Sequence, residues 1–197
     1  RNIDYCIREY IRNRMSTLGV NKITPSTGTT ITLGDSGDTF TIPSGVTLTN
    51  NGSASGFGGI TEADQWRLTA NTSVPGDITT NWERVDTDGF GYLGTGMTES
   101  SGIFSFPSTG IYLVEANTSV NAGQDVFIKT TTDNSTYDDA VKIVNQSDRS
   151  HSGSFIFDVT NTSTHKVRMT TTGGSGVMVG DTNKNTSYFT FIRLGDT

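Results

Sequence analysis

Carboxylates cluster in three places along the chain, and the largest cluster lies in one short segment of the C-terminal half, where it could bind a cation or a partner. The segment TTDNSTYDDA places Asp133, Asp138 and Asp139 around Tyr137. Carboxylate oxygens in Asp- and Asn-rich loops are ligands that calcium accepts. An aromatic ring in a loop can stack on a sugar or anchor a protein contact. We therefore expect a binding site at these four residues, with no cofactor and with calcium as the one candidate ion.

No arrangement of residues for catalysis is visible in the sequence. His151 and His165 lie among polar turn residues without a metal ligand at suitable spacing, which predicts two surface histidines. No Gly-x-Ser-x-Gly elbow stands between a strand and a helix, so serine hydrolase chemistry has no support. A glycan depolymerase would need paired carboxylates in a groove, and this stays the third alternative. The sequence predicts a protein that is not an enzyme.

The composition argues against several classes of partner. The net charge is −6 and no stripe of lysine and arginine is present, which argues against nucleic acid. No apolar run approaches the roughly 20 residues of a membrane helix, so membrane insertion is not expected. Hydrophobic residues make up 32% of the chain and charged residues 17%. The abundance of Gly, Ser, Thr and Asn around short alternating segments indicates many strands joined by turns.

The N-terminal segment, residues 1–20, differs from the rest of the chain because its apolar residues recur at helical spacing. It predicts a short amphipathic helix, stopped by Gly19, that either packs against copies of itself or docks on a larger assembly. A third interpretation is that the native protein starts at Met15 and that the first fourteen residues lie upstream of it.

The segment of residues 21–59 reads as a shaft followed by a hinge. Apolar residues alternate in short segments between Gly-Asp-Ser-Gly-Asp and Pro-Ser-Gly turns. Segments this small cannot offset the entropy of ordering about forty residues within one chain. Three chains around a common axis could do so. The expected axis residues are Ile31, Leu33, Phe40, Ile42, Val46 and Leu48.

From Ile60 onward, strand-like segments recur at the spacing of a two-sheet sandwich. They cover residues 65–69, 78–85, 103–106, 111–119, 125–131, 140–145, 153–159, 166–171, 177–179 and 187–194. Two of them flank a Pro-Ser-Thr-Gly turn in IFSFPSTGIYLVE, which predicts a hairpin. The aromatic residues Trp66, Trp82, Phe90 and Tyr92 are expected near loops, and the two tryptophans also suit a core or a subunit interface.

A family resemblance rests on these strands. A Phe-x-Phe strand ending at Phe106, a turn with Gly110, a Gly-x-Tyr strand and the closing strand Tyr188–Phe191 resemble the signature of the complement C1q family. The globular head of that family shares its jelly roll with the tumour necrosis factors. The resemblance covers roughly residues 60–194. The spacings do not all match, and no collagen repeat precedes the head.

The shaft resembles those of phage and cyanophage fibres, and the whole chain looks like virion appendage proteins of marine bacteriophages. The resemblance implies a mainly β, homotrimeric fibre with an N-terminal attachment segment (residues 1–20), a β shaft (21–59) and a C1q-like jelly-roll knob (60–197). Such a protein would sit on the virion, contact other virion proteins through its N-terminus, and present the knob to a host receptor or glycan or decorate the capsid.

An alternative from another class is a non-viral extracellular adhesin or filament subunit. Within the knob, loops opposite the end that holds Ile60 and Leu194 would face the host. The loop of residues 131–139 is expected among them.

Overall fold

The structure is a computed structural model that describes residues 23–49, 59–145 and 149–197. The helix predicted for residues 1–20 lies outside these ranges. The chain divides between Ser53 and Ala54 into two units, a first unit and a C-terminal head, and each is described by itself.

The described part of the first unit, residues 23–49, contains turns and no strand. Hydrogen bonds close turns at two of the predicted positions, from the Asp38 amide to the Asp35 carbonyl at 3.0 Å and from the Val46 amide to the Pro43 carbonyl at 3.2 Å. All six predicted axis residues are exposed in the single chain. Because each apolar segment is only two or three residues long, none finds a pairing partner within these residues.

The head is built from eleven strands. Their bounds are β1 (Ala63–Leu68), β2 (Thr72–Asp77), β3 (Trp82–Arg84), β4 (Thr98–Ser100), β5 (Ile103–Ser105), β6 (Gly110–Val120), β7 (Gln124–Thr131), β8 (Asp138–Asn145), β9 (Arg149–Val159), β10 (Lys166–Met178) and β11 (Tyr188–Gly195). The described residues contain no helix, which confirms the mainly β prediction.

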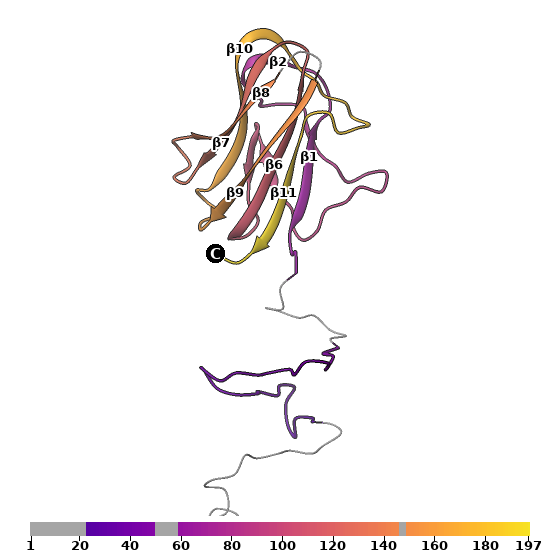
Figure 1. Ribbon diagram of the computed structural model, residues 1–197, viewed down its shortest axis with the longest axis vertical. Coiled ribbons are helices and arrows are strands. Elements are labelled where there is room, and N and C mark those ends of the chain that lie inside the picture. The colour runs from indigo at the N-terminus through magenta and orange to yellow at the C-terminus, as the bar shows by residue number, and fades with distance from the viewer. Residues whose placement is uncertain (1–22, 50–58, 146–148) are drawn as a thin grey trace, which may run out of the picture. The chain divides into compact units, whose positions relative to one another are not determined.

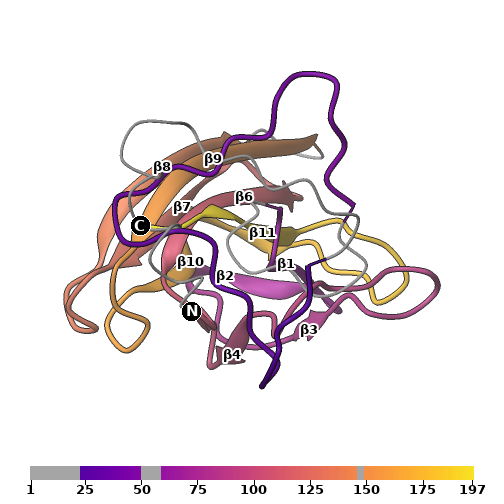
Figure 2. The ribbon, with the colours of Figure 1, turned by 90° about the horizontal axis from the view of Figure 1, so that it is seen from below.

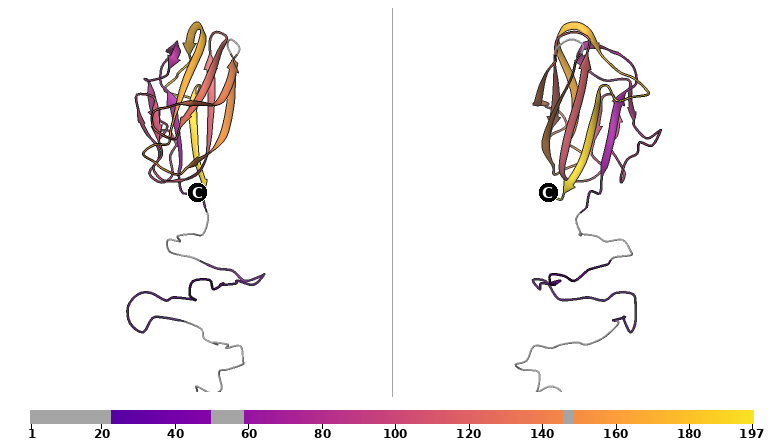
Figure 3. Two further views of the ribbon diagram at one scale, coloured as in Figure 1. Left: turned by 90° about the vertical axis from the view of Figure 1, so that its left-hand side faces the viewer. Right: turned by 45° about the vertical axis from the view of Figure 1, so that its right-hand side comes forward.

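The strands pair antiparallel in two layers (Figure 1, Figure 3). The first sheet has the order β3-β1-β11-β6-β9. In the second sheet β7 lies between β8 and β10, while β5 and β2 pair along the other edge of β10 and β4 lies outside β5. A single pairing, Val120 with Met178, joins the layers at one end. At one margin β8 and β9 lie side by side (Figure 2).

An aromatic cluster fills the space between the sheets. The ring of Phe104 from β5 lies 5.1 Å from Phe189 and 5.4 Å from Phe191, both on β11. The indoles of Trp66 and Trp82 pack against the same ring at 5.7 and 5.2 Å. Both tryptophans therefore support the core.

The predicted hairpin at the Pro-Ser-Thr-Gly turn is wrong. β5 pairs with β4 and β10, whereas β6 pairs with β9 and β11, so the turn crosses from the second sheet to the first. The crossing lets Phe106 and Tyr112 meet across the core with ring centroids 4.7 Å apart. Phe106 follows β5 and is not a strand residue.

Gly110 has a positive φ of 149°, and a Cβ there would lie 2.6 Å from the Gly195 carbonyl oxygen. This position requires glycine, because any side chain would clash with the end of β11.

Three further strands differ from the expectation, and one of them, β4, has no counterpart among the predicted segments. β2 was not predicted, because its Pro75 and Gly76 are typical of turns. β10 runs through both segments predicted at residues 166–171 and 177–179, with a register shift against β2 between Thr171 and Gly176. The glycines of TTTGGSG permit that bulge, and they made the sequence resemble two strands with a turn.

Candidate interaction face

A row of apolar side chains crosses the outer face of the first sheet. Burial alternates strictly along β6, so Leu113 points away from the core. The register places it opposite Ile192 on β11 and Ile156 on β9. Ile192 faces Ala63, which pairs in turn with Leu93. We call these five residues the apolar row. At its two ends, Leu93 is 47% and Ile156 58% exposed.

Polar residues fill the next register position of the same face. Gln65, Thr190, Glu115 and Ser154 follow one another across the sheet, and the Gln65 amide donates to the Thr190 hydroxyl at 3.0 Å. Within the described ranges, the Glu115 carboxylate has no hydrogen-bond or ion-pair partner. The face thus combines an apolar row with an unpaired carboxylate at its centre.

The outer face of the second sheet is covered by ion pairs. Their nitrogen-to-oxygen distances are short, and they cross the sheet from one strand to the next: Lys129 to Asp139 at 2.6 Å, Lys142 to Asp125 at 2.7 Å and Arg168 to Asp77 at 2.8 Å. The two lysine ammonium groups also lie 5.9 and 5.6 Å from the ring centroid of Phe127. Six charged side chains of this face are therefore paired within one chain.

The four residues predicted to bind lie close to this second face, where the structure gives three of them partners in the chain. The Asp133 carboxylate accepts the amides of Thr136 and Ser135 at 2.8 Å each. These bonds, with one from the Thr131 hydroxyl, hold the pKa of Asp133 well below its usual range. The site is a self-contained turn at Asp133.

The other predicted binding residues differ in their contacts within the chain. The Arg168 guanidinium lies 4.0 Å from the ring centroid of Tyr137, and burial raises the pKa of the phenol. Asp139 is paired with Lys129, while Asp138 is exposed. Asp138 alone is free to meet a partner without breaking a contact.

The loop of residues 131–139 does not lie at the end that was predicted. Thr131 pairs with Lys166, where β10 begins, and the preceding strand β9 ends at Val159 opposite Gly110. The same end holds Gly195, which pairs with Ile111. The loop therefore lies at the end where β1 begins and the chain finishes (Figure 1). β6 runs away from the end that holds Gly110, and β7 runs back toward it. The loop that follows β7 therefore lies at the end opposite to the predicted one.

The histidines do not form a metal site in the described part of the chain. There, no three His, Cys, Asp or Glu side chains converge. His165 is buried, contrary to the prediction of a surface residue, because its ring packs 5.5 Å from Phe157 and its nitrogens lie 3.1 and 3.3 Å from the Thr164 and Thr160 hydroxyls. Calcium binding stays a prediction.

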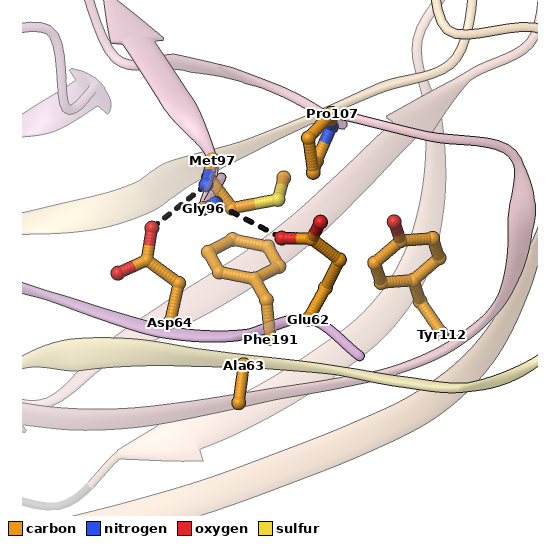
Figure 4. A pocket seen from close by; sticks show the side chains of 8 residues that line it. All are labelled: Glu62, Ala63, Asp64, Gly96, Met97, Pro107, Tyr112 and Phe191. Atoms are coloured by element: carbon orange, nitrogen blue, oxygen red, sulfur yellow. Dashed lines mark hydrogen bonds between the residues drawn. The ribbon is translucent and has the colours of Figure 1, made fainter. Parts of the chain in front are cut away.

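Two carboxylates that the sequence analysis missed fix the loop between β3 and β4 (Figure 4). Asp64, which is buried, accepts the Met97 amide at 2.7 Å and the Trp66 indole N–H at 2.9 Å. Glu62 accepts the amides of Thr95 and Gly96 at 2.8 and 3.0 Å. The space between these groups has no room for a ligand. Their role is to hold the backbone.

The Arg84 guanidinium completes this arrangement. It donates to Asp64 at 3.2 Å and to the Met97 carbonyl, and it lies over two rings, 5.1 Å from the Trp66 centroid and 4.5 Å from that of Tyr92. No local sequence signal indicates these contacts, because Arg84 meets residues that lie up to 20 positions away in the chain.

No protein-family model and no curated protein sequence matches this chain. Solved structures do. Eiger, a tumour necrosis factor of S. frugiperda, is 14% identical over 68% of this chain and 93% of its own, with a TM-score of 0.51. Murine APRIL is 12% identical over 68% of this chain and 98% of its own, with a TM-score of 0.53. The vertex protein P5 of PRD1 scores 0.45, at 13% identity over 71% and 100%.

The first two likenesses confirm the predicted jelly roll of the tumour necrosis factor type for the head. At these identities they show the fold alone. Within the described residues, no helix is long and apolar enough to cross a membrane.

Proposed function

We propose that the protein is the subunit of a homotrimeric virion appendage that presents its head to a host surface or decorates the capsid. The observation that carries the proposal is the contrast between the two outer faces of the head. One face carries three ion pairs made within the chain. The other carries the apolar row and a single cross-strand ion pair, Arg67 with Glu83. An apolar row on an otherwise polar protein is the kind of surface that a second copy covers.

The row suits a closed ring of copies. Its two ends lie at opposite edges of the sheet, Leu93 beside β1 and Ile156 on β9, so one edge of a copy can pack against the other edge of the next. Such head-to-tail contacts form a ring when the rotation closes. Full burial of one leucine or isoleucine side chain contributes about 1.5–3 kcal/mol, so three rows of this kind stabilise a trimer substantially.

The shaft supports the same assembly. Its apolar side chains, among them Leu33 and Phe40, are exposed in the single chain, and the described residues 23–49 contain no strand. We propose that three copies of this segment wrap around one axis and that the six predicted residues meet there. Residues 1–20 attach the trimer to other virion proteins in this proposal.

Light scattering of the full chain tests the assembly. We expect a mass three times that of the chain, independent of concentration over the accessible range. A chain that stays monomeric overturns the trimer and the roles given to the apolar row and the shaft.

Antibody labelling tests the location. Particles purified from the source culture should carry label on their appendages or capsid. Label confined to cell envelopes, with none on particles, overturns the virion assignment and favours a cellular adhesin.

A further inference from the structure

A single loop of the head carries both of its strongly exposed aromatic side chains. Phe90, Tyr92 and Leu93 are each 47% exposed, and no other aromatic residue of the described head is exposed to this degree. We call residues 86–93 the aromatic loop. It projects from the side of the head beyond β3 (Figure 1, Figure 2). Leu93 belongs to the apolar row, whereas the rest of the loop extends past the sheet.

Main-chain hydrogen bonds fix both ends of the loop. The Val85 amide donates to the Gln65 carbonyl at 2.9 Å, and Leu93 exchanges two bonds with Ala63 at 2.8 and 3.1 Å. Within the loop, the Phe90 amide donates to the Thr87 carbonyl at 2.9 Å. The bonds from Glu62 and Asp64 hold the residues that follow. A loop ordered in this way loses little conformational freedom when a partner binds.

The residues that hold the ends of the loop also fix the ring of Tyr92. Arg84 lies between the rings of Tyr92 and Trp66, while Asp64 and the Met97 carbonyl occupy its N–H groups. The ring of Tyr92 is thereby held by a cation that is itself fixed from the core side. Tyr92 keeps about half of its surface open to solvent.

The two carboxylates of the loop are unpaired acceptors. Asp86 and Asp88 have no hydrogen-bond or ion-pair partner among the described residues. The Arg84 guanidinium beside the loop is already bound by Asp64 and the Met97 carbonyl. A ligand that fits must therefore offer hydrogen-bond donors and an apolar face, and it must not depend on a free cation.

We propose that the aromatic loop is a contact for a neutral saccharide. The C–H face of a pyranose packs on Phe90 and Tyr92, and its hydroxyl groups donate to the carboxylates of Asp86 and Asp88. A pyranose combines an apolar face with several O–H donors in one rigid ring, and these complement the two kinds of group that the loop leaves exposed or unpaired. The site deepens the proposed attachment function and rests on it, since it names the chemical class that the head would meet.

Saturation-transfer NMR on the full chain tests the site with named probes. The neutral probes are glucose, galactose, mannose and N-acetylglucosamine, and the acidic probe is glucuronic acid. We expect transfer to the ring protons of at least one neutral sugar and none to glucuronic acid. In the variant Phe90→Ser with Tyr92→Ser the transfer should be lost, while light scattering still gives the trimer mass.

Tyr137→Ala is the matched control, because it removes an aromatic ring beside carboxylates on the other sheet. Transfer should persist in it. The proposal is overturned if no neutral sugar shows transfer, or if transfer is lost in Tyr137→Ala instead. It is also overturned if the double variant becomes a monomer, because the loop would then be a contact between copies.

A second variant separates this proposal from the trimer. The loop and its base lie within one chain, so Ile156→Glu should give monomers that still show transfer. If the wild-type chain is monomeric yet shows transfer, the assembly proposal fails and the saccharide site stands.

Discussion

The two sheets of the head share one core and differ in what they present outward. On the second sheet, lysine, arginine and aspartate side chains pair across strands, as Lys129 and Asp139 do at 2.6 Å. On the first sheet, leucine and isoleucine form an outward row, and Glu115 has no partner in the described residues. The ion pair of this face, Arg67 with Glu83, lies at its β3 edge. A surface that satisfies its own charges needs no partner. In the proposed trimer, this difference assigns the first sheet to the contact between copies.

Both faces depend on the core beneath them, so the largest effect should come from that core. Phe191 is buried under the apolar row and packs against Phe104. Phe191→Ala should lower the free energy of unfolding by about 3–5 kcal/mol. Denaturant unfolding measures it.

The matched variant for this test is Thr190→Val, on the opposite side of β11, which should stay within about 0.5 kcal/mol of wild type apart from its lost bond to Gln65. Equal effects of the two variants would contradict the assignment of inward and outward residues on β11.

The next largest effect is expected for Glu115, at the centre of the outer face of the first sheet. If the outer face of the first sheet is buried between copies, its unpaired charge opposes assembly. Glu115→Gln should lower the concentration at which the trimer dissociates by at least about tenfold, because about 1.4 kcal/mol corresponds to a factor of ten. Sedimentation at decreasing concentration measures this change.

Asp138→Asn is the control for that experiment, since it removes an exposed carboxylate at the edge of the second sheet. It should leave the dissociation concentration unchanged. A tighter trimer in both variants would mean that net charge, and not the position of Glu115, sets the stability of the assembly.

A smaller effect is expected for the ion pairs of the second sheet. The Lys142–Asp125 pair is partly exposed, and pairs of this kind contribute about 0.2–1 kcal/mol. Lys142→Met should lower the free energy of unfolding by no more than this amount and leave the trimer mass unchanged. A monomeric Lys142→Met protein would mean that the second sheet takes part in the contact between copies, which would contradict the proposal.

The smallest effect concerns Asp133 and depends on pH. Its folded pKa lies below the unfolded value of about 3.9, so its carboxylate stabilises the fold above about pH 4 and this contribution is lost as the pH falls toward the folded pKa. Thermal melts should show Asp133→Asn below wild type at neutral pH, with the gap closing on acidification. A gap that widens in acid would contradict the hydrogen bonds assigned to this carboxylate.

Much of the fold could be predicted because alternation is local. The apolar periodicity around Tyr112 and Phe189 located the central strands, and both residues lie in strands of the core. Pairing could not be predicted in the same way. The turn before Gly110 looked like a hairpin, yet it crosses between sheets because Phe104 and Tyr112 must face one core from opposite sides.

The outer face of the first sheet was harder to predict from the sequence than the strands were. Its members are close only through register: Leu113 meets Ile156 because β6 pairs with β9, and no spacing in the sequence reports this. One local signal was present, since IYLV in β6 carries apolar residues on both faces of the strand. The contacts that hold the aromatic loop could not be predicted from the sequence, because Asp64 and Met97 lie far apart in the chain.

The central claim is that the first sheet faces other copies and the second sheet faces solvent. Light scattering of two variants tests it most directly. Ile156 and Val144 are similar in size and are 58% and 61% exposed on β9 and β8, which lie side by side at one margin of the head. Changing either to glutamate places the same charge on one face or the other.

We expect Ile156→Glu to give a folded monomer, because each copy would have to bury a new charge against its neighbour, and Val144→Glu to keep the trimer. Circular dichroism confirms that both variants are folded. A trimer in Ile156→Glu together with a monomer in Val144→Glu would contradict the account.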